Sequence, residues 1–548
     1  MQPLYTHYIQ ETFGPDGQVT DWHYEYEDNF NYAYDILDVL AQDQPGKLAM
    51  LWRNDRGAET KLTLEDLSVL SNRMANLFRS HGLKRGDVVL TALRSHWSWW
   101  IVALAAHKLG LILAPCYYLL TEQDFLYRMT KARAKCVITC RENGADQRVL
   151  AAAEQAGVPV RFALGGGGGF LDLLGNMDKQ PGVLGRIPTL ASDPMMLYFT
   201  SGTTGQPKGV LHDYAYPLSN YWGAKYMQDI HPASLHFATG DTGWEVVCGT
   251  KFYGQWMLGG ALLVYDYDRF PPEKVLETLA ETKVTGMMAQ PTVYRKLTQV
   301  GMDRYDLSSI TNYAVGGEKL SPDLVNVVRE QTGHPLYEGY AQSETNLIAA
   351  ASKTFGRREG SMGRILPKYH VEILREDGTF AQPGETGEIV IVADGGRRPI
   401  GMMTGYLNDE EATRRLWDGD IFHTCDLGTR DADGFLFYQG RADGIIKTKG
   451  YRVSPVEIED ALSLHPAVAE SLAVGEPDPE LGQKVKVYVH LAPGYAPSQA
   501  LREELMAFHN DASAGFKKIR GLEFVGPLRR NPNGKVLRGQ FAKTPTKI

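Results

Sequence analysis

The sequence of 548 residues lacks an uninterrupted apolar segment long enough to cross a bilayer. Its most apolar stretch, residues 101–120, contains His107, Lys108, Gly110 and Pro115. A membrane-spanning helix needs about 20 consecutive apolar residues, so this stretch is excluded as a membrane span. We expect a helix, a turn and a strand there, and no membrane partner.

Cysteine is scarce, and the five cysteines form no C-x-x-C pair and show no metal-type spacing with histidine. An odd, scattered set of this kind indicates reduced thiols in a reducing compartment. The first residues also lack the basic start and apolar run of a signal peptide. The sequence therefore predicts a cytoplasmic protein.

The chain has no excess of positive charge: 57 Lys and Arg face 65 Asp and Glu, which gives a net charge of -8. This balance argues against a protein whose main task is to bind nucleic acid, although a small anion could still be held locally. Apolar residues at 43% and charged residues at 22% are ordinary values for a globular protein. At roughly 100 to 200 residues per domain, the length predicts about three or four domains.

Between about residues 60 and 340, helical patterns alternate with short β-branched runs, which is typical of βαβ units around a parallel sheet. Thr63 is expected to cap a helix that ends near Gly82, and a strand is expected to begin at Val88. Ser321 is expected to cap a second helix that ends at Gly333. These patterns predict an α/β fold.

The sequence pattern changes at about Asp377, after which short strand-like runs predominate. A compact block with its own helices and strands begins near Gly440. This last block, of about 105 residues, is large enough to fold as a small α+β domain. We place a domain boundary near Asp443. The only low-complexity segment is Gly165 to Gly169, which predicts a flexible surface loop.

The sharpest local signal is YFTSGTTGQPKG at residues 198–209. Its glycines permit close backbone approach, its hydroxyls donate hydrogen bonds, and Lys208 adds a positive charge, which together suit a phosphate. A Walker A pattern cannot be laid on it, so a P-loop NTPase is disfavoured. Taken alone, the segment leaves a phosphate cradle and a Gly/Thr-rich surface loop equally open.

Five further segments follow in order: GDTGW at Gly240, GGEKL at Gly316, YEGYAQSET at Tyr337, the stretch from HTCDLG to GRADGIIKTKGYRVSPVEIE, and NPNGK at Asn531. With the phosphate-type segment, they resemble the superfamily of acyl-adenylating enzymes that contains AMP-forming acyl-CoA synthetases, luciferases and peptide-synthetase adenylation domains. The six segments span residues 198–535. The α/β texture before them is compatible, so the resemblance covers essentially the whole chain.

The resemblance implies a large N-terminal domain, residues 1–442, made of α/β subdomains with a small distorted β-barrel-like part. It also implies a small mobile α+β domain at residues 443–548, with Asp443 as the hinge. Gly444 and Lys449 depart from the family pattern, in which an acidic residue and a serine are usual. The two domain positions would serve two successive reactions in one pocket.

The resemblance also implies residue roles for ATP, Mg²⁺ and coenzyme A. Glu344 would hold Mg²⁺, Tyr340 would stack on adenine, and Asp426 would accept hydrogen bonds from the ribose, with Cys425 replacing a glycine beside it. The expected catalytic residues are Lys535, Glu344, Thr200 and Lys208. The expected nucleotide- and coenzyme-binding residues are Thr200, Ser201, Gly202, Thr203, Thr204, Gly205, Lys208, Gly317, Glu318, Lys319, Tyr340, Gln342, Ser343, Asp426, Arg441, Gly450 and Arg452.

The Asp-Thr-Gly-Trp element is most similar to the medium-chain branch of acyl-CoA synthetases. The implied acid pocket consists of Trp244, Glu245, Val246, Gly316, Gly339 and Ala341. Acetate-activating relatives have a tryptophan where Ala341 stands, so Ala341 together with Gly316 implies a longer pocket. Glu245 is expected to point to solvent, and the alternative is that it meets a polar substituent on the acid.

The sequence therefore predicts an AMP-forming acid:CoA ligase that acts on a medium-chain, branched or aromatic monocarboxylate. Its partners would be that acid, ATP and coenzyme A, and the oligomeric state is left open. Two alternatives are an enzyme that loads a carrier protein and a non-catalytic nucleotide sensor on the same fold.

Overall fold

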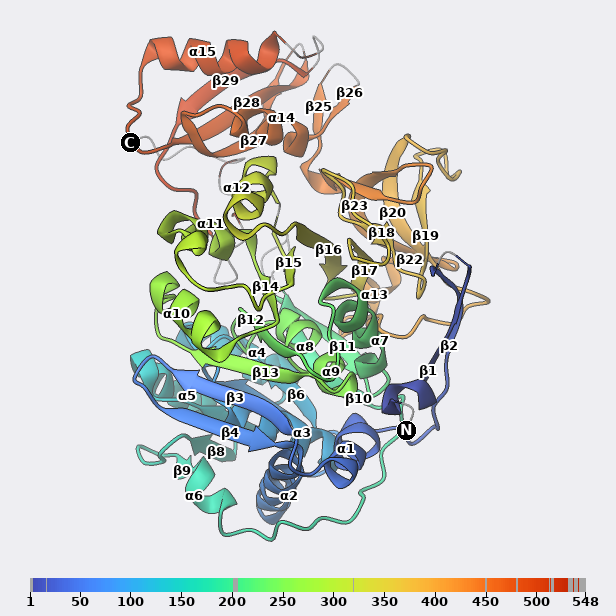
Figure 1. The fold of residues 1–548 in the computed structure, drawn as a ribbon, viewed down its shortest axis with the longest axis vertical. Coiled ribbons are helices and arrows are strands. Elements are labelled where there is room, and N and C mark those ends of the chain that lie inside the picture. The colour runs from blue at the N-terminus through green and yellow to red at the C-terminus, as the bar shows by residue number, and fades with distance from the viewer. Residues whose placement is uncertain are drawn as a thin grey trace.

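The computed structural model describes residues 3–15, 17–200, 206–318, 320–448, 451–479, 481–511, 513, 517–530, 536 and 541. Four larger sheets carry the fold, and Figure 1 shows the last of them, near the C-terminus, as a separate body at one end of the molecule. A short hairpin of β1 (Ile9–Phe13) and β2 (Val19–Tyr24) lies near the N-terminus.

Two large mixed sheets form the main body of the chain. Each has a parallel centre and antiparallel strands at one edge or both, which confirms the predicted α/β class. In spatial order, the first sheet comprises β21 (Gly405–Tyr406), β11 (Lys208–Asp213), β10 (Pro194–Thr200), β6 (Ile112–Pro115), β5 (Val88–Ala92), β7 (Cys136–Thr139), β8 (Val160–Ala163) and β9 (Leu171–Asp172). The second comprises β18 (Arg364–Ile365), β17 (Asn346–Ala350), β16 (Leu336–Gln342), β15 (Asn312–Gly316), β14 (Gly286–Ala289), β12 (Leu235–Ala238), β13 (Ala261–Asp266), β3 (Leu48–Asn54) and β4 (Glu59–Thr63).

The helices predicted after Thr63 and Ser321 are both confirmed. Thr63 caps α2 (Leu64–Ser80) by accepting from the backbone N–H of Asp66, whose side chain accepts in return from the backbone of Thr63. The other longer helices are α3 (Ser98–Leu109), α4 (Glu122–Ala132), α5 (Ala145–Gln155), α10 (Pro272–Thr282), α11 (Pro291–Val300) and α12 (Pro322–Thr332). Shorter ones are α1 (Val39–Asp43), α6 (Leu173–Met177), α7 (Tyr216–Trp222), α8 (Val246–Thr250) and α9 (Tyr253–Met257).

The apolar stretch at residues 101–120 is confirmed as helix, turn and strand, because α3 ends at Gly110 and β6 follows. Gly110 takes the left-handed conformation, with φ of 72°, that ends a helix without steric cost. Across the described residues, no helix combines the length and the apolar character that crossing a membrane requires.

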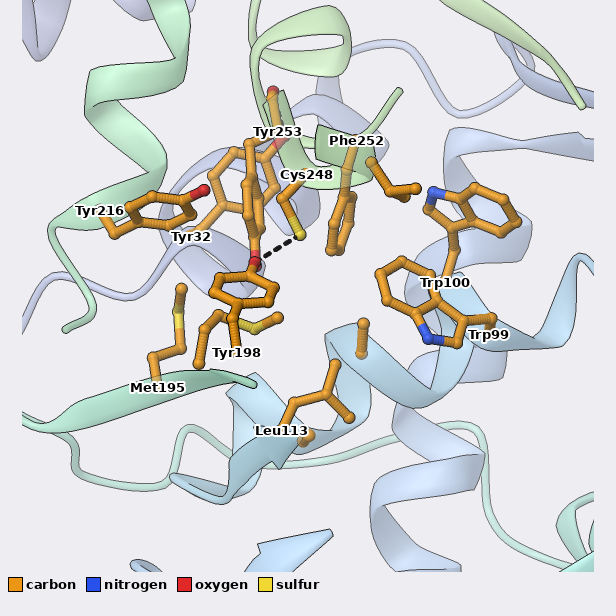
Figure 2. Packing of buried hydrophobic residues seen from close by; sticks show 14 of the residues in the cluster. Tyr32, Trp99, Trp100, Leu113, Met195, Tyr198, Tyr216, Cys248, Phe252 and Tyr253 are labelled. Atoms are coloured by element: carbon orange, nitrogen blue, oxygen red, sulfur yellow. Dashed lines mark hydrogen bonds between the residues drawn. The ribbon is translucent and has the colours of Figure 1, made fainter. Parts of the chain in front are cut away.

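The core of the main body is rich in large aromatic side chains. Figure 2 shows Trp99 and Trp100 of α3 opposite Tyr198 of β10, with Cys248 of α8 beside them. The Tyr198 hydroxyl lies 2.9 Å from the Cys248 sulfur. All four side chains are at most 2% exposed, so α8 is fixed on the first sheet by buried contacts.

Two smaller sheets follow along the chain. The third contains β19 (His370–Leu374), β20 (Thr386–Val392), β23 (Ile421–Arg430), β22 (Trp417–Asp418) and β24 (Leu436–Arg441), with α13 (Glu410–Arg414) beside it. The fourth contains β26 (Tyr451–Val453), β25 (Ile446–Thr448), β28 (Gly482–Leu491), β27 (Val468–Asp478) and β29 (Ile519–Phe524), together with α14 (Pro455–Ser463) and α15 (Gln499–Asn510). The fourth sheet has its own apolar core, which is consistent with a separate α+β domain.

The glycine run at Gly165 to Gly169 lies at the surface, as expected, apart from the buried Gly166. All five residues have positive φ, between 57° and 88°, a region that side chains with a Cβ atom rarely adopt. A β-carbon on Gly166 would lie 2.8 Å from the backbone nitrogen of Asp172. The composition of this loop is therefore required by its backbone path.

Candidate active site

The predicted phosphate-binding segment joins two antiparallel strands. Thr200, at the end of β10, is the register partner of Lys208, at the start of β11. This pairing keeps the two predicted catalytic residues side by side at one end of the hairpin. Residues 201–205, which connect them, lie outside the described part of the chain.

Tyr406 links Lys208 to the predicted metal ligand Glu344. Strand β21 pairs with β11 and places the Tyr406 ring 4.7 Å from the Lys208 ammonium nitrogen. The Tyr406 hydroxyl donates a hydrogen bond of 2.8 Å to the Glu344 carboxylate. Tyr406 thus holds an anion and a cation of the predicted phosphate site next to each other.

Asp426, the predicted ribose carboxylate, lies at the centre of a group of donors and is only 4% exposed. Tyr340 donates to its Oδ2 at 2.6 Å, and the Gln342 amide donates to the same oxygen. The other oxygen, Oδ1, has two more distant donors: the Arg441 guanidinium at 3.3 Å and the Tyr438 hydroxyl at 3.4 Å. The structure therefore brings four of the expected nucleotide residues together, and their carboxylate is ordered by its neighbours before any ligand arrives.

The pKa of the Tyr340 hydroxyl is raised well above its ordinary value of 10, because the ring is buried and because Asp426 is next to it. Tyr340 therefore remains a neutral donor at physiological pH. The stacking of the Tyr340 ring on adenine remains a prediction.

Cys425, beside Asp426, has a φ of 58°. The left-handed conformation favours glycine, the residue that Cys425 replaces in the family pattern. Its backbone N–H donates to Glu388 at 2.8 Å, which holds this conformation in place. The departure from the pattern is thus accommodated with strain at one residue.

Trp244 packs against the GGEKL segment. A β-carbon on Gly317, whose φ is 86°, would lie 3.1 Å from the Trp244 ring. The next residue, Glu318, accepts hydrogen bonds from the backbone and the side chain of Thr292 at the start of α11. The carboxylate of Glu318 therefore has a structural role at this helix end, and its part in binding the nucleotide remains a prediction.

Gly316 and Gly339, both predicted to belong to the acid pocket, are packed inside the second sheet. A β-carbon on Gly316 would lie 3.1 Å from the Gly339 carbonyl oxygen, and one on Gly339 would lie 2.6 Å from the Met227 sulfur. A β-carbon at either position would thus meet its neighbours closely, and the longer acid pocket expected from Gly316 and Ala341 remains a prediction. Ala341, two positions farther along β16, is exposed, as a pocket residue should be.

Glu245 does not point to solvent, contrary to expectation. It directly precedes α8, and its carboxylate accepts a hydrogen bond of 2.6 Å from the buried Tyr216 hydroxyl. Loss of hydration and the nearby Glu344 charge raise the pKa of Glu245 to about 7. Val246 follows at the start of α8 and, like Glu245, is half-buried.

Several predicted residues lie outside the described part of the chain, so their roles stay predictions. They are Ser201, Gly202, Thr203, Thr204, Gly205, Lys319, Lys449, Gly450 and Lys535, and the side chains of Asp443 and Arg452 are outside it as well.

The donor set suits a magnesium ion that is shared with phosphates. Within the described residues, no group of three or more His, Cys, Asp or Glu side chains could hold a metal by itself. Mg²⁺ in nucleotide sites is typically bound by one or two carboxylates and by substrate phosphate oxygens. Glu344, fixed by Tyr406 and close to Lys208, provides such a carboxylate.

Sequence reasoning missed Tyr406, His212 and Tyr216. Strand periodicity could have indicated His212, since it lies on the same face of β11 as Lys208 and Val210. Its Nε2 donates to the Ser343 carbonyl at 2.7 Å. Tyr406 carries no such signal, because only the pairing of β21 with β11 brings it to the site.

The chain matches known proteins over nearly its whole length. Residues 37–407 match the model of a family described as AMP-binding enzyme, and residues 457–535 match that of the AMP-binding enzyme C-terminal domain. The human protein named acyl-coenzyme A synthetase ACSM5, mitochondrial, is 34% identical over 526 residues, which cover 93% of this chain and 90% of the human protein. Mouse acyl-coenzyme A synthetase ACSM3, mitochondrial, is 32% identical over 533 residues, with 95% and 92% covered.

Among solved structures, the anthranilate CoA ligase AuaEII in complex with anthranoyl-AMP is similar, with a TM-score of 0.84 and 25% identity. The match covers 94% of this chain and 97% of that ligase. The Brucella canis acyl-CoA synthetase matches with a TM-score of 0.73 and 26% identity, covering 94% of each chain.

Proposed function

Because the chain belongs to the AMP-binding enzyme family, we propose that its active site joins a monocarboxylic acid to coenzyme A at the expense of ATP. The observation that carries this function is the connection of Lys208, Tyr406 and Glu344 next to the Asp426 cluster. It provides groups for phosphates and for a ribose in one place. The relatives named as acyl-CoA synthetases support the acyl acceptor, coenzyme A.

The reaction has two steps. A carboxylate oxygen attacks the α-phosphorus of ATP, a new P–O bond forms, and the bond to the β-phosphate breaks, releasing pyrophosphate. The coenzyme A sulfur then attacks the acyl carbon, the C–O bond to AMP breaks, and AMP leaves as the thiol gives up its proton. Mg²⁺, when bound, supplies positive charge to the phosphates.

The chain's own residues position the nucleotide and stabilise charge. Lys208 and Thr200 would contact phosphate oxygens, where preorganised donors favour the charge that develops in the transition state. Asp426 would orient the ribose, and Glu344, fixed by Tyr406, would hold the metal ion. Lys535 would complete this set in the first step, and Gly450 would leave room for the pantetheine arm in the second.

We place the domain boundary at residues 442 and 443, with Asp443 as the hinge. The separate core of the fourth sheet supports this boundary. Rotation of the C-terminal domain about Asp443 would move Lys535 out of the active site and bring the surface that carries Gly450 into it, because the two cannot occupy one pocket together.

The acid is proposed to be a medium-chain, branched or aromatic monocarboxylate. The mammalian relatives and the exposed Ala341 support a substrate larger than acetate. Cytoplasmic location remains a prediction, and both mammalian relatives carry the word mitochondrial in their names.

The first experiment incubates the protein with Mg-ATP, coenzyme A and acids from acetate through octanoate to benzoate. AMP, pyrophosphate and acyl-CoA are measured together. Acid-dependent formation of all three supports the ligase. Pyrophosphate without acyl-CoA would indicate a carrier-protein acceptor, no nucleotide turnover would favour a sensor, and acetate as the best acid would contradict the proposed substrate class.

A pair of variants tests the two-step assignment. Lys535→Ala is expected to lose acyl-AMP formation by about 100-fold or more, while it still converts supplied acyl-AMP into thioester. Gly450→Leu is expected to do the opposite, because the new side chain fills the space for pantetheine. Equal loss of both steps in either variant would refute the division of roles.

A further inference from the structure

Glu245 is a half-buried carboxylate that the reaction described above does not use. The Tyr216 hydroxyl donates to one of its oxygens at 2.6 Å. Figure 2 shows Tyr216 near Tyr198 and Cys248, within the buried cluster that supports α8. The position of Glu245 is therefore fixed by the core and not by solvent.

The acceptor capacity of Glu245 is largely unfilled. A carboxylate has about four lone-pair positions, and among the described residues only Tyr216 donates to Glu245. The described part of the chain also provides no ion pair to it. Lys368, whose charge lowers the pKa of Glu245, is buried and donates instead to the Ser219 hydroxyl at 2.8 Å.

Glu245 also lies close to the reaction centre. Its neighbour in sequence, Trp244, packs against Gly317, which belongs to the GGEKL segment and is a predicted nucleotide-binding residue. Its partner Tyr216 packs against His212 with tilted rings whose centroids are 4.2 Å apart, and His212 donates to the Ser343 carbonyl at 2.7 Å. Ser343 directly precedes Glu344, so three successive contacts connect Glu245 to the segment that carries the predicted metal ligand.

A half-buried carboxylate with free acceptor positions is accessible to a ligand that donates a hydrogen bond to it. We propose that Glu245 is the residue that selects the acid, by accepting a hydrogen bond from a hydroxyl or amino group on its carbon skeleton. The inference rests on the proposed ligase function and refines its substrate class. The preferred substrates are hydroxy- or amino-substituted monocarboxylates, and plain hydrocarbon acids of the same shape are poorer.

The test compares acids that have the same shape but differ in the donor. Hydroxy- and aminobenzoates are paired with methylbenzoates at each of the three ring positions, and 4-hydroxypentanoate is paired with 4-methylpentanoate. The measured quantity is kcat/KM for acid-dependent pyrophosphate release. At pH 8, above the pKa of about 7 of Glu245, a hydrogen bond to the charged carboxylate predicts a preference of about 10- to 100-fold for the donor acid in at least one pair.

Substitutions at Glu245 should change this preference in a graded way. Glu245→Leu should abolish or reverse it, and Glu245→Gln should reduce it several-fold, since a neutral amide oxygen is a weaker acceptor. Glu273→Leu, at an exposed position on α10, is the matched control and should keep the wild-type ratio. Should the leucine variant fail to fold, the glutamine variant alone decides.

The possible failures are distinguishable. Pyrophosphate release without a donor preference in any pair overturns the role of Glu245, as does a preference that survives in both Glu245 variants. Absence of pyrophosphate with every acid refutes the proposed function, and the inference falls with it.

Discussion

At the scale of single residues, Cys425 combines a strained backbone with a position next to the ribose carboxylate. Its φ of 58° is one of seven positive values among non-glycine residues of the described chain. The left-handed conformation costs about 1–2 kcal/mol for a residue with a Cβ atom. The backbone conformation of Cys425 therefore lowers the stability of the folded chain. The same conformation determines where the next residue, Asp426, lies.

We predict that Cys425→Gly raises the free energy of unfolding by about 0.5–1 kcal/mol, because relief of strain exceeds the added entropy of the unfolded glycine. Urea unfolding of the two proteins measures the difference. Cys425→Ala keeps the Cβ atom and should give no gain. A gain of equal size in both variants would show that the thiol, and not the backbone, is responsible.

Tyr406 provides the second prediction at this scale. Tyr406→Phe keeps the ring beside Lys208 but removes the hydrogen bond that orients Glu344. Loss of a partner that orients a metal ligand typically costs 10- to 100-fold, so kcat/KM for pyrophosphate formation should fall by about 10-fold or more. Tyr495→Phe, at a residue 47% exposed, is the control. An unchanged rate in Tyr406→Phe would remove Tyr406 from the site.

At the scale of an element, the five-glycine loop is a defined turn. Gly166 and Gly168 have nearly equal φ values, 57° and 60°, but different surroundings. The space beside Gly166 contains the Asp172 backbone, whereas nothing lies within 4 Å of a β-carbon at Gly168. The pair separates the cost of the backbone conformation from the cost of a clash.

We predict that Gly168→Ala lowers the free energy of unfolding by about 1 kcal/mol and Gly166→Ala by about 2–3 kcal/mol. Thermal and urea unfolding of both variants provide the comparison. Equal losses at the two positions would mean that the loop moves away from Asp172 at no cost.

Local signals were enough to predict the bounds of α2 and α12, because helix ends depend largely on neighbouring residues. Thr63 forms the predicted cap of α2, whereas Ser321 takes the N-cap position of α12 without a capping hydrogen bond from its side chain. The order of the family segments likewise predicted that Tyr340, Gln342 and Asp426 would share a site. Neither the helix-end patterns nor the order of the family segments predicts where the Glu245 side chain points, because that depends on the packing of Tyr216 in α7. The filled space beside Gly316 also depends on long-range packing, here of β16 against β15.

At the scale of the whole molecule, Glu338 of β16 and Asp460 of α14 bring two acidic groups together across the proposed domain boundary. Glu338 lines a cavity of about 40 Å³ with Leu336 and Arg357. Burial and the Asp460 charge raise the pKa of Glu338 from 4.5 to about 8. Near neutral pH, the folded protein therefore holds a proton that the unfolded chain releases.

The stability of the protein depends on pH through Glu338. Between pH 4.5 and 8 the unfolded chain binds fewer protons than the folded one at this group, so its contribution to stability falls as pH rises. Glu338→Gln removes this effect. The variant should gain stability over the wild type between pH 5 and pH 8, by about 1–2 kcal/mol, a value reduced for the partial exposure of the side chain.

Urea midpoints at pH 5, 6.5 and 8 measure this gain. Glu359→Gln, at an exposed residue that lines the same cavity, is the control and should show no pH-dependent gain. A difference between Glu338→Gln and the wild type that stays constant with pH would contradict the proton linkage.

The short strand β21 also affects the order in which the protein can mature. Lys208 and Tyr406 are separated by roughly 200 residues of chain, a contact of high sequence separation that forms late in folding. A nascent chain on the ribosome contains the β10–β11 hairpin long before Tyr406 is synthesised. The contact between Lys208 and Tyr406 therefore forms only after translation has passed the second sheet.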